Sequence, residues 1–124
     1  MKQLNFVFTC LDGNYEFVGK LDDVLVYTVE TNIEGLNSFE GELDKKNSEE
    51  YLKKIEMAKI DKWDREYKGD NPIEDGVKWY VKYIDEDKVY VSSGEESFEP
   101  YNYEHLIEAL LVCDKNAEYF MIGR

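Results

Sequence analysis

The strongest constraint on the fold is the alternation of side chains over residues 77–83, within a segment that extends to Ile84. The odd positions are apolar or aromatic and the even positions carry two lysines and a tyrosine: Val77, Trp79, Val81 and Tyr83 against Lys78, Tyr80 and Lys82. Successive side chains point to opposite faces only in a β-strand. The pattern therefore predicts a strand with one face in the core and one face partly in water. The acidic residues 85–88 then turn the chain into a second strand at residues 89–91, which predicts a hairpin.

The same alternation marks the beginning of the chain. Leu4, Phe6, Phe8 and Cys10 alternate with smaller or polar residues. The Asp-Gly-Asn turn at residues 12–14 separates this strand from a second one at 15–19. A third strand is expected at 24–30, followed by a loop and a short strand within 31–43. These segments predict an antiparallel meander.

Two helices interrupt the strands. Asn47 with Glu50 three positions later fits a capping box at the start of the first helix. One face of that helix is apolar: Tyr51, Leu52, Ile55 and Ala58. Ile60 and Trp63 leave this face, so the helix is expected to end near residues 58–59 and to be followed by a separate anchor.

Asn102 is expected to cap a second helix that runs to about Cys113. The apolar tail at residues 119–122 is expected to form an edge strand or a homodimer contact. The prediction is a single α+β domain over residues 1–124. A mostly antiparallel sheet, made of the N-terminal meander and the C-terminal hairpin, carries two helices packed on one face.

Charge limits the partners. The 15 Lys and Arg against 28 Asp and Glu give a net charge of −13. Nucleic-acid binding and binding to an anionic membrane surface both need a basic face, so neither is expected. The acid lies in residues 1–46 and 69–124, whereas residues 47–68 are balanced. The charge leaves two possibilities open, a basic protein partner or no partner at all.

Cysteine usage and hydropathy favour a cytoplasmic protein. Cys10 and Cys113 are 103 positions apart, which matches no zinc, redox or disulfide pattern, so both are expected to be buried or half-buried thiols. The apolar stretch after Met1 is too short for a secretory signal. No stretch approaches the roughly 18 apolar residues of a membrane span.

No catalytic or metal-binding pattern is present, so an enzyme is not expected. His105 is the single histidine and is predicted to lie on the surface, away from both cysteines. Residues 70–76 resemble a calcium loop in being acidic with a glycine, but Pro72 or Ile73 falls where the third ligand should be. No cofactor or metal ligand is predicted. An unrecognised pair of carboxylates would be needed for the alternative of a hydrolase.

Aromatic residues gather in the C-terminal half, and two interpretations remain open for them. They are either core packing or an aromatic patch with an acidic rim that holds a partner. The members of this aromatic group are Trp63, Tyr67, Trp79, Tyr80, Tyr83, Tyr90, Tyr101 and Tyr103. The candidate binding residues are Tyr80, Lys82, Tyr90, Glu95, Glu96, Glu99 and Tyr101.

One pattern in this half resembles a module of many uncharacterised bacterial proteins. The pattern combines a tryptophan–tyrosine pair, a DG-x-x-W motif, a glycine and a P-x-N helix entry: Trp63, Tyr67, Asp75, Gly76, Trp79, Gly94, Pro100 and Asn102. The resemblance covers about residues 55–113 and leaves out the first 46. It implies no activity. It implies a turn at Asp75-Gly76, packing of the sheet on a helix by Trp63 and Trp79, and capping by Asn102.

The function expected first is a non-enzymatic binding protein that neutralises a basic surface on another protein. A bacterial immunity protein or a phage-type inhibitor would belong to this class. The second hypothesis is a protein that binds a nucleotide-like small molecule in an aromatic pocket, which would require Lys78, Lys82 or Arg124 to converge on it. The hydrolase is the third.

Overall fold

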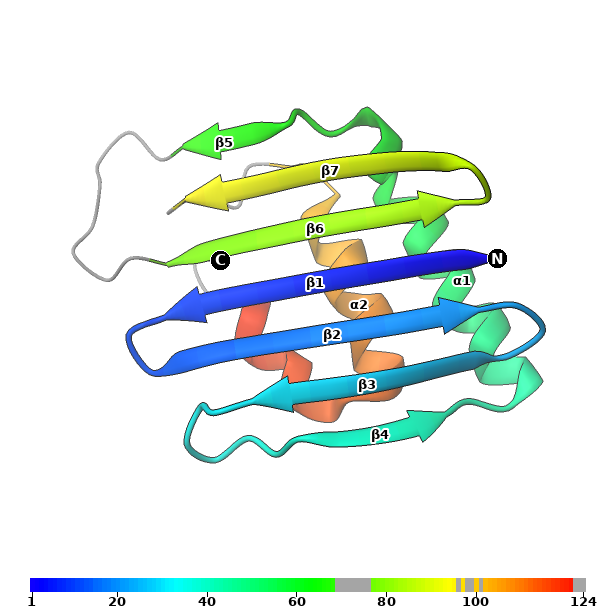
Figure 1. Ribbon diagram of the computed structural model, residues 1–124, viewed down its shortest axis with the longest axis horizontal. Helices are drawn as coiled ribbons and strands as arrows, with labels where there is room; N and C mark the ends of the chain where they lie inside the picture. Colours follow the sequence, from blue (N-terminus) through cyan, green and yellow to red (C-terminus); the bar gives the residue numbers. More distant parts are fainter. Residues whose placement is uncertain (69–76, 96, 98–99, 101, 122–124) are drawn as a thin grey trace.

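A computed structural model describes residues 1–68, 77–95, 97, 100 and 102–121. Its seven strands form one sheet in the order β4-β3-β2-β1-β6-β7-β5 (Figure 1). All neighbouring strands are antiparallel except β5 and β7. The strands are β1 (Lys2–Cys10), β2 (Gly13–Leu21), β3 (Leu25–Thr31), β4 (Phe39–Glu42), β5 (Glu66–Lys68), β6 (Lys78–Asp85) and β7 (Lys88–Glu95). The predicted α+β class, with its N-terminal meander and C-terminal hairpin, is confirmed.

β1 is the central strand and joins the two predicted parts of the sheet. It pairs with β2 along one edge and with β6 along the other, so Phe6 lies directly opposite both Phe17 and Val81. All three side chains are fully buried. Burial of large apolar side chains on three adjacent strands fixes the register, since a slip by one residue would turn them toward water.

The helices pack on one face of this sheet. They are α1 (Lys45–Ala58) and α2 (Tyr103–Cys113), with the short 3₁₀ segments η1 (Ile60–Lys62) and η2 (Lys115–Met121). Figure 1 shows α1 and α2 behind the strands, with the sheet turned to the viewer. Ile55 from α1 and Leu106 and Leu110 from α2 are buried with the sheet in one core.

The start of α1 differs from the capping box predicted at Asn47. Asp44 is the N-cap, and its side chain accepts a hydrogen bond from the backbone N–H of Asn47 at 2.8 Å. A carboxylate three residues earlier satisfies the free N–H group, so the helix begins one turn sooner. The helix ends at Ala58, as predicted, and Lys59 follows it in a left-handed conformation with φ 51°. Asn102 occupies the N-cap position of α2 but makes no side-chain capping hydrogen bond.

The C-terminal tail is not the predicted edge strand. Residues Lys115–Met121 form η2, which continues from the end of α2. Phe120 is fully buried, with its ring centroid 4.7 Å from that of Phe8 and 4.3 Å from that of Tyr15. The aromatic side chain therefore fills the core between α2 and the sheet, and this packing overrides the strand propensity of the tail.

The two cysteines form no disulfide. Cys10 and Cys113 are both free and half-buried, as predicted. Burial raises the pKa of the Cys113 thiol to about 12, which keeps it protonated and unreactive at neutral pH. Within the described ranges, none of the helices has the length and apolar character needed to cross a bilayer.

Candidate functional site

The face of the sheet opposite the helices is uncovered. No helix or strand of the described part of the chain lies over it (Figure 1). β6 shows the division clearly: Trp79 and Val81 are buried toward the helices, whereas Tyr80 on the other face is 38% exposed. This confirms the partly hydrated face predicted from the alternation in residues 77–83. We refer to this side of the sheet as the open face.

Charge on the open face is divided by β1. Strands β2, β3 and β4 place one lysine there, Lys20, against four glutamates, which we call the acidic patch: Glu16, Glu30, Glu40 and Glu42. Strands β5, β6 and β7 carry three lysines, which we call the lysine group, against Glu66 and Glu95: Lys68, Lys78 and Lys82. One side of the open face is therefore net negative and the other slightly positive.

The acidic patch contains an unfavourable pair. Glu16 and Glu30 lie directly opposite each other on β2 and β3. Like charges in directly opposed cross-strand positions destabilise a sheet. None of the ion pairs found among the described residues involves a member of the patch. Both glutamates also line an open depression of about 520 Å³. The patch is thus an uncompensated concentration of negative charge facing solvent.

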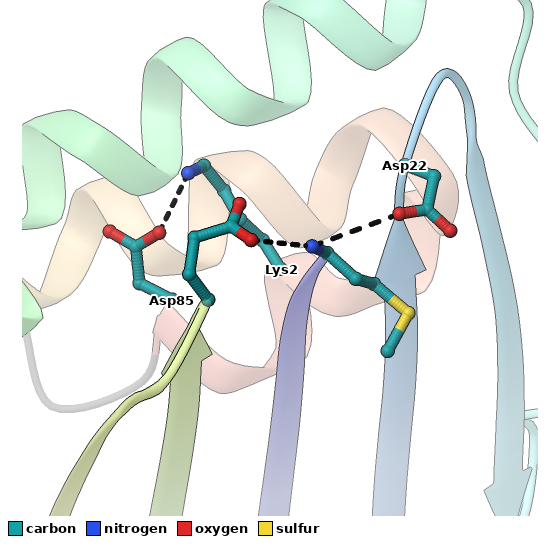
Figure 2. A network of polar contacts seen from close by, with 5 residues as sticks. Lys2, Asp22 and Asp85 are labelled. Atoms are coloured by element: carbon teal, nitrogen blue, oxygen red, sulfur yellow. Dashed lines mark hydrogen bonds and ion pairs between the residues drawn. The ribbon is translucent and has the colours of Figure 1, made fainter.

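A second group of acids, at the turns of the sheet, is neutralised within the chain (Figure 2). The N-terminal ammonium donates a hydrogen bond to Glu86 at 2.9 Å and lies 3.8 Å from Asp22. Lys2 donates to Asp85 at 2.7 Å. The Glu86 carboxylate raises the pKa of the N-terminal ammonium, and Asp85 raises that of Lys2. These acids bind the chain's own cations, which leaves the acidic patch as the better candidate for an external one.

The structure places the predicted binding residues on both faces of the sheet. Tyr80, Lys82 and Glu95 share the open face. Tyr90 lies on the helix side of β7, where its ring stacks on Tyr83 at 6.4 Å. Three further candidates lie outside the described residues: Glu96, Glu99 and Tyr101.

A depression of about 230 Å³ lies beside Tyr80. Lys68 and Lys78 line it together with Glu66 and Glu95. Two carboxylates offset the two ammonium groups, so the depression lacks the net positive charge that a nucleotide phosphate requires. Arg124, the third basic residue considered for such a ligand, lies outside the described residues.

Most side chains of the described aromatic group pack around Trp79. The Trp79 ring centroid lies 5.7 Å from that of Trp63, 6.0 Å from that of Tyr67 and 5.6 Å from that of Tyr103. The indole N–H donates to the carbonyl oxygen of Ser97 at 2.6 Å. Trp63 and Trp79 thus pack the sheet against α2, as the resemblance implied. The rings contact one another, and Tyr67 and Trp79 also line the depression beside Tyr80.

Gly94 completes this cluster from β7. It lies opposite Trp79 in the antiparallel pairing with β6. A Cβ atom at this position would come within 2.3 Å of the indole ring, so only glycine leaves room for the tryptophan. Four residues of the recognised pattern, Trp63, Tyr67, Trp79 and Gly94, therefore meet at one point of the core.

His105 is paired with a carboxylate on its own helix. The Nδ1 atom of the half-buried His105 lies 2.6 Å from a carboxylate oxygen of Glu108, one turn along α2. Across the residues that the structure describes, no three His, Cys, Asp or Glu side chains are grouped to hold a metal ion. The acidic stretch at residues 70–76 lies outside them.

A buried carboxylate at the end of α2 has a structural role. Asp114 is 6% exposed and accepts hydrogen bonds from the Tyr15 hydroxyl at 2.8 Å and from the backbone N–H of Asn116 at 2.9 Å. Burial and the Asp114 charge raise the pKa of Tyr15. These bonds tie β2 to the start of η2.

Replacing Asp114 with asparagine is expected to lower the free energy of unfolding by about 1 kcal/mol, because a hydrogen bond to a charged acceptor becomes a neutral one. Urea unfolding followed by tryptophan fluorescence would measure this change. Asp23→Asn, at an exposed residue of the β2–β3 turn, is the matched control and should leave stability unchanged. Equal stability of the two variants would show that the Tyr15–Asp114 bond contributes nothing.

No protein-family model matches this chain, and comparison with curated proteins finds no significant relative. The pattern that meets at Trp79 is therefore not attached to a described family by these comparisons. The function has to be inferred from the surface of the molecule itself.

Proposed function

We propose that this chain is a non-enzymatic binding protein, of the immunity or inhibitor kind, that engages a basic surface on another protein. The observation that supports the proposal is the acidic patch on the open face. Its four glutamates lie on three adjacent strands and have no cation of their own among the described residues. A basic partner would supply the missing positive charge.

The electrostatics of the whole chain favour the same partner. A net charge of −13 attracts a basic protein over a distance of about one Debye length, roughly 8 Å at physiological salt. Such attraction raises the association rate and becomes weaker as salt increases. The uncovered strands offer a broad surface for such a partner.

The hydrolase alternative gains no comparable support. Glu16 and Glu30 form a close carboxylate pair, but they lie on an uncovered sheet face. A carboxylic acid held protonated for catalysis needs an apolar enclosure that separates its environment from that of its neighbour. Glu30 is exposed and Glu16 is half-buried on a face that no element covers, so neither has such an enclosure and the pair suits binding of a cation better than acid–base chemistry.

The proposal is tested with two double variants of equal charge. Glu40→Lys with Glu42→Lys reverses the edge of the acidic patch, and Glu49→Lys with Glu50→Lys makes the same change on exposed positions of α1. Each purified protein is used as bait at low salt in lysate of the source organism, followed by a salt gradient and mass spectrometry.

We expect the unmodified chain to retain a basic protein that salt releases. The α1 variant should retain it too. The amount retained by the β4 variant should fall at least about tenfold, since like charges would then face each other. Equal losses in both variants would show that net charge alone acts and would remove the acidic patch as the site. No basic protein on any bait would overturn the proposal.

A further inference from the structure

We propose that the open face also docks a second copy of this chain, through a twofold axis that runs along β1. The inference rests on the proposed function in taking the open face as a protein-binding surface, and it names one occupant of it. The observations that carry it are the strand order, the positions of the exposed apolar residues and the division of charge.

The strand order makes the face suited to self-association. β1 has three strands on either side in the order β4-β3-β2-β1-β6-β7-β5. When two such sheets face each other about an axis along β1, β2 lies over β6 of the second copy and β3 lies over its β7. Sheets that pack face to face have strand directions about 30° apart. With strands about 4.8 Å apart, a residue one strand from the axis meets those within about one position of its opposite, and a residue two strands away meets those within about two.

Exposed apolar residues occupy matching positions. Val26 on β3 and Val89 on β7 are 52% and 54% exposed. They lie in one row across the sheet, which runs from Val26 through Lys20, Gln3 and Ile84 to Val89. Each is two strands from β1, so the twofold axis places Val26 of one copy over Val89 of the other.

The charges match under the same operation. Glu16 lies in a row with Val7 and Tyr80, so the axis places it over Tyr80 of the second copy. Tyr80 is flanked on the same face by Lys78 and Lys82. Among the described residues, the side chains of Lys78, Tyr80 and Lys82 make no hydrogen bond or ion pair with another side chain. The second copy therefore gives Glu16 a hydroxyl donor and two cations, which offsets its repulsion from Glu30.

The contact is large enough for a moderate dimer and leaves part of the acidic patch free. Five central strands about 4.8 Å apart and about 25 Å long give roughly 600 Å² on each copy. The total of about 1,200 Å² is at the lower limit of specific interfaces. β4 pairs with Val26–Val29, whereas β5 pairs at the opposite end of the sheet with Ser93–Glu95. Glu40 and Glu42 are therefore not covered by β5 of the second copy and stay available to a basic target.

The test uses charge reversals that should restore each other. Glu16→Lys relieves the pair with Glu30 within one chain, so this variant should fold at least as well as the parent. Lys82 lies opposite Asn5 and Val91, which are uncharged, so Lys82→Glu creates no like-charge pair across the strands. The controls are Glu50→Lys and Lys53→Glu on the exposed side of α1. Sedimentation velocity of the purified full chain is measured over a wide concentration range, for each variant alone and for equal mixtures.

The unmodified chain and both α1 controls should form a concentration-dependent dimer of twice 14.6 kDa. Glu16→Lys and Lys82→Glu should each weaken it about a hundredfold, because every reversal acts twice across the axis. Their equal mixture should dimerise again, since each reversed glutamate or lysine then faces its opposite charge.

Three results would overturn the dimer. These are a chain that stays at 14.6 kDa at every concentration, a dimer that both reversals leave intact, and a mixture that fails to recover. A monomeric chain that still retains a basic protein through Glu40 and Glu42 would remove this inference and keep the proposed function. A dimer that retains no basic protein would remove the proposed function and keep this inference.

Discussion

Replacing Trp79 with alanine is expected to lower the free energy of unfolding by about 3–5 kcal/mol, the range seen for buried aromatic side chains. Trp79 is 2% exposed and its ring contacts Trp63, Tyr67 and Tyr103. The change leaves a cavity between β6 and α2, and the carbonyl oxygen of Ser97 loses the indole donor. A domain of this size has a total stability of about 5–15 kcal/mol, so the variant should fold but unfold at much lower urea concentration.

The neighbouring tyrosine supplies the control for Trp79. Tyr80 is adjacent in the chain but lies on the open face and is 38% exposed. Tyr80→Ala should cost about 1 kcal/mol or less, because it leaves no buried cavity. Chemical unfolding followed by far-ultraviolet circular dichroism suits both variants, since one of them loses a fluorescent residue. Similar losses in the two variants would contradict the assignment of opposite faces to residues 79 and 80.

Gly94→Val is expected to be the second most damaging single change, at about 3 kcal/mol, the upper end of typical overpacking costs. The backbone of Gly94 contacts the Trp79 indole so closely that a Cβ atom would lie 2.3 Å from it. Valine favours strands by propensity, so any loss of stability must come from this steric conflict. Gly35→Ala is a useful contrast, because a Cβ atom there meets no atom within 4 Å and only its φ of 90° opposes the change.

A double-mutant cycle separates the steric cause from other effects of Gly94→Val. In the Trp79→Ala background the cavity can accept the valine side chain. The loss of unfolding free energy caused by Gly94→Val should therefore be smaller there than in the unmodified chain, by more than about 1 kcal/mol. Additive losses would show that Gly94 is required for its backbone alone. The cycle is measured by the same unfolding curves.

Part of the candidate site could be predicted from the sequence. The alternation in β6 placed Lys78, Tyr80 and Lys82 on a hydrated face, because period two in a strand leaves no other arrangement. The acidic patch was missed. Glu16 and Glu30 each alternate with buried residues, which signals their face, but their direct opposition depends on the pairing of β2 with β3. The charge pattern of a sheet face follows from strand order and register, and both are set by contacts between distant residues.

The errors at the ends of the helices have a similar cause. Asp44 and Asn47 are both good N-cap residues, and which of them begins α1 depends on how the preceding strand delivers the chain. The buried Ser48 also donates to Leu43 and accepts from the backbone N–H of Leu25, which links the first turn of α1 to β3. The tail was predicted from composition alone as an edge strand or a homodimer contact, and the strand did not form because Phe120 fills the space beside Phe8 and Tyr15.

The sequence by itself determined the α+β class, the meander, the hairpin and the end of α1 at Ala58. Each of these depends on periodicity and turn residues that act over a few positions. Only the tertiary structure placed β1 at the centre, gathered Trp63, Tyr67, Trp79 and Gly94 into one cluster, and left a charged sheet face uncovered. These features come from strand pairing and side-chain packing between residues far apart in the chain, which local preferences do not specify.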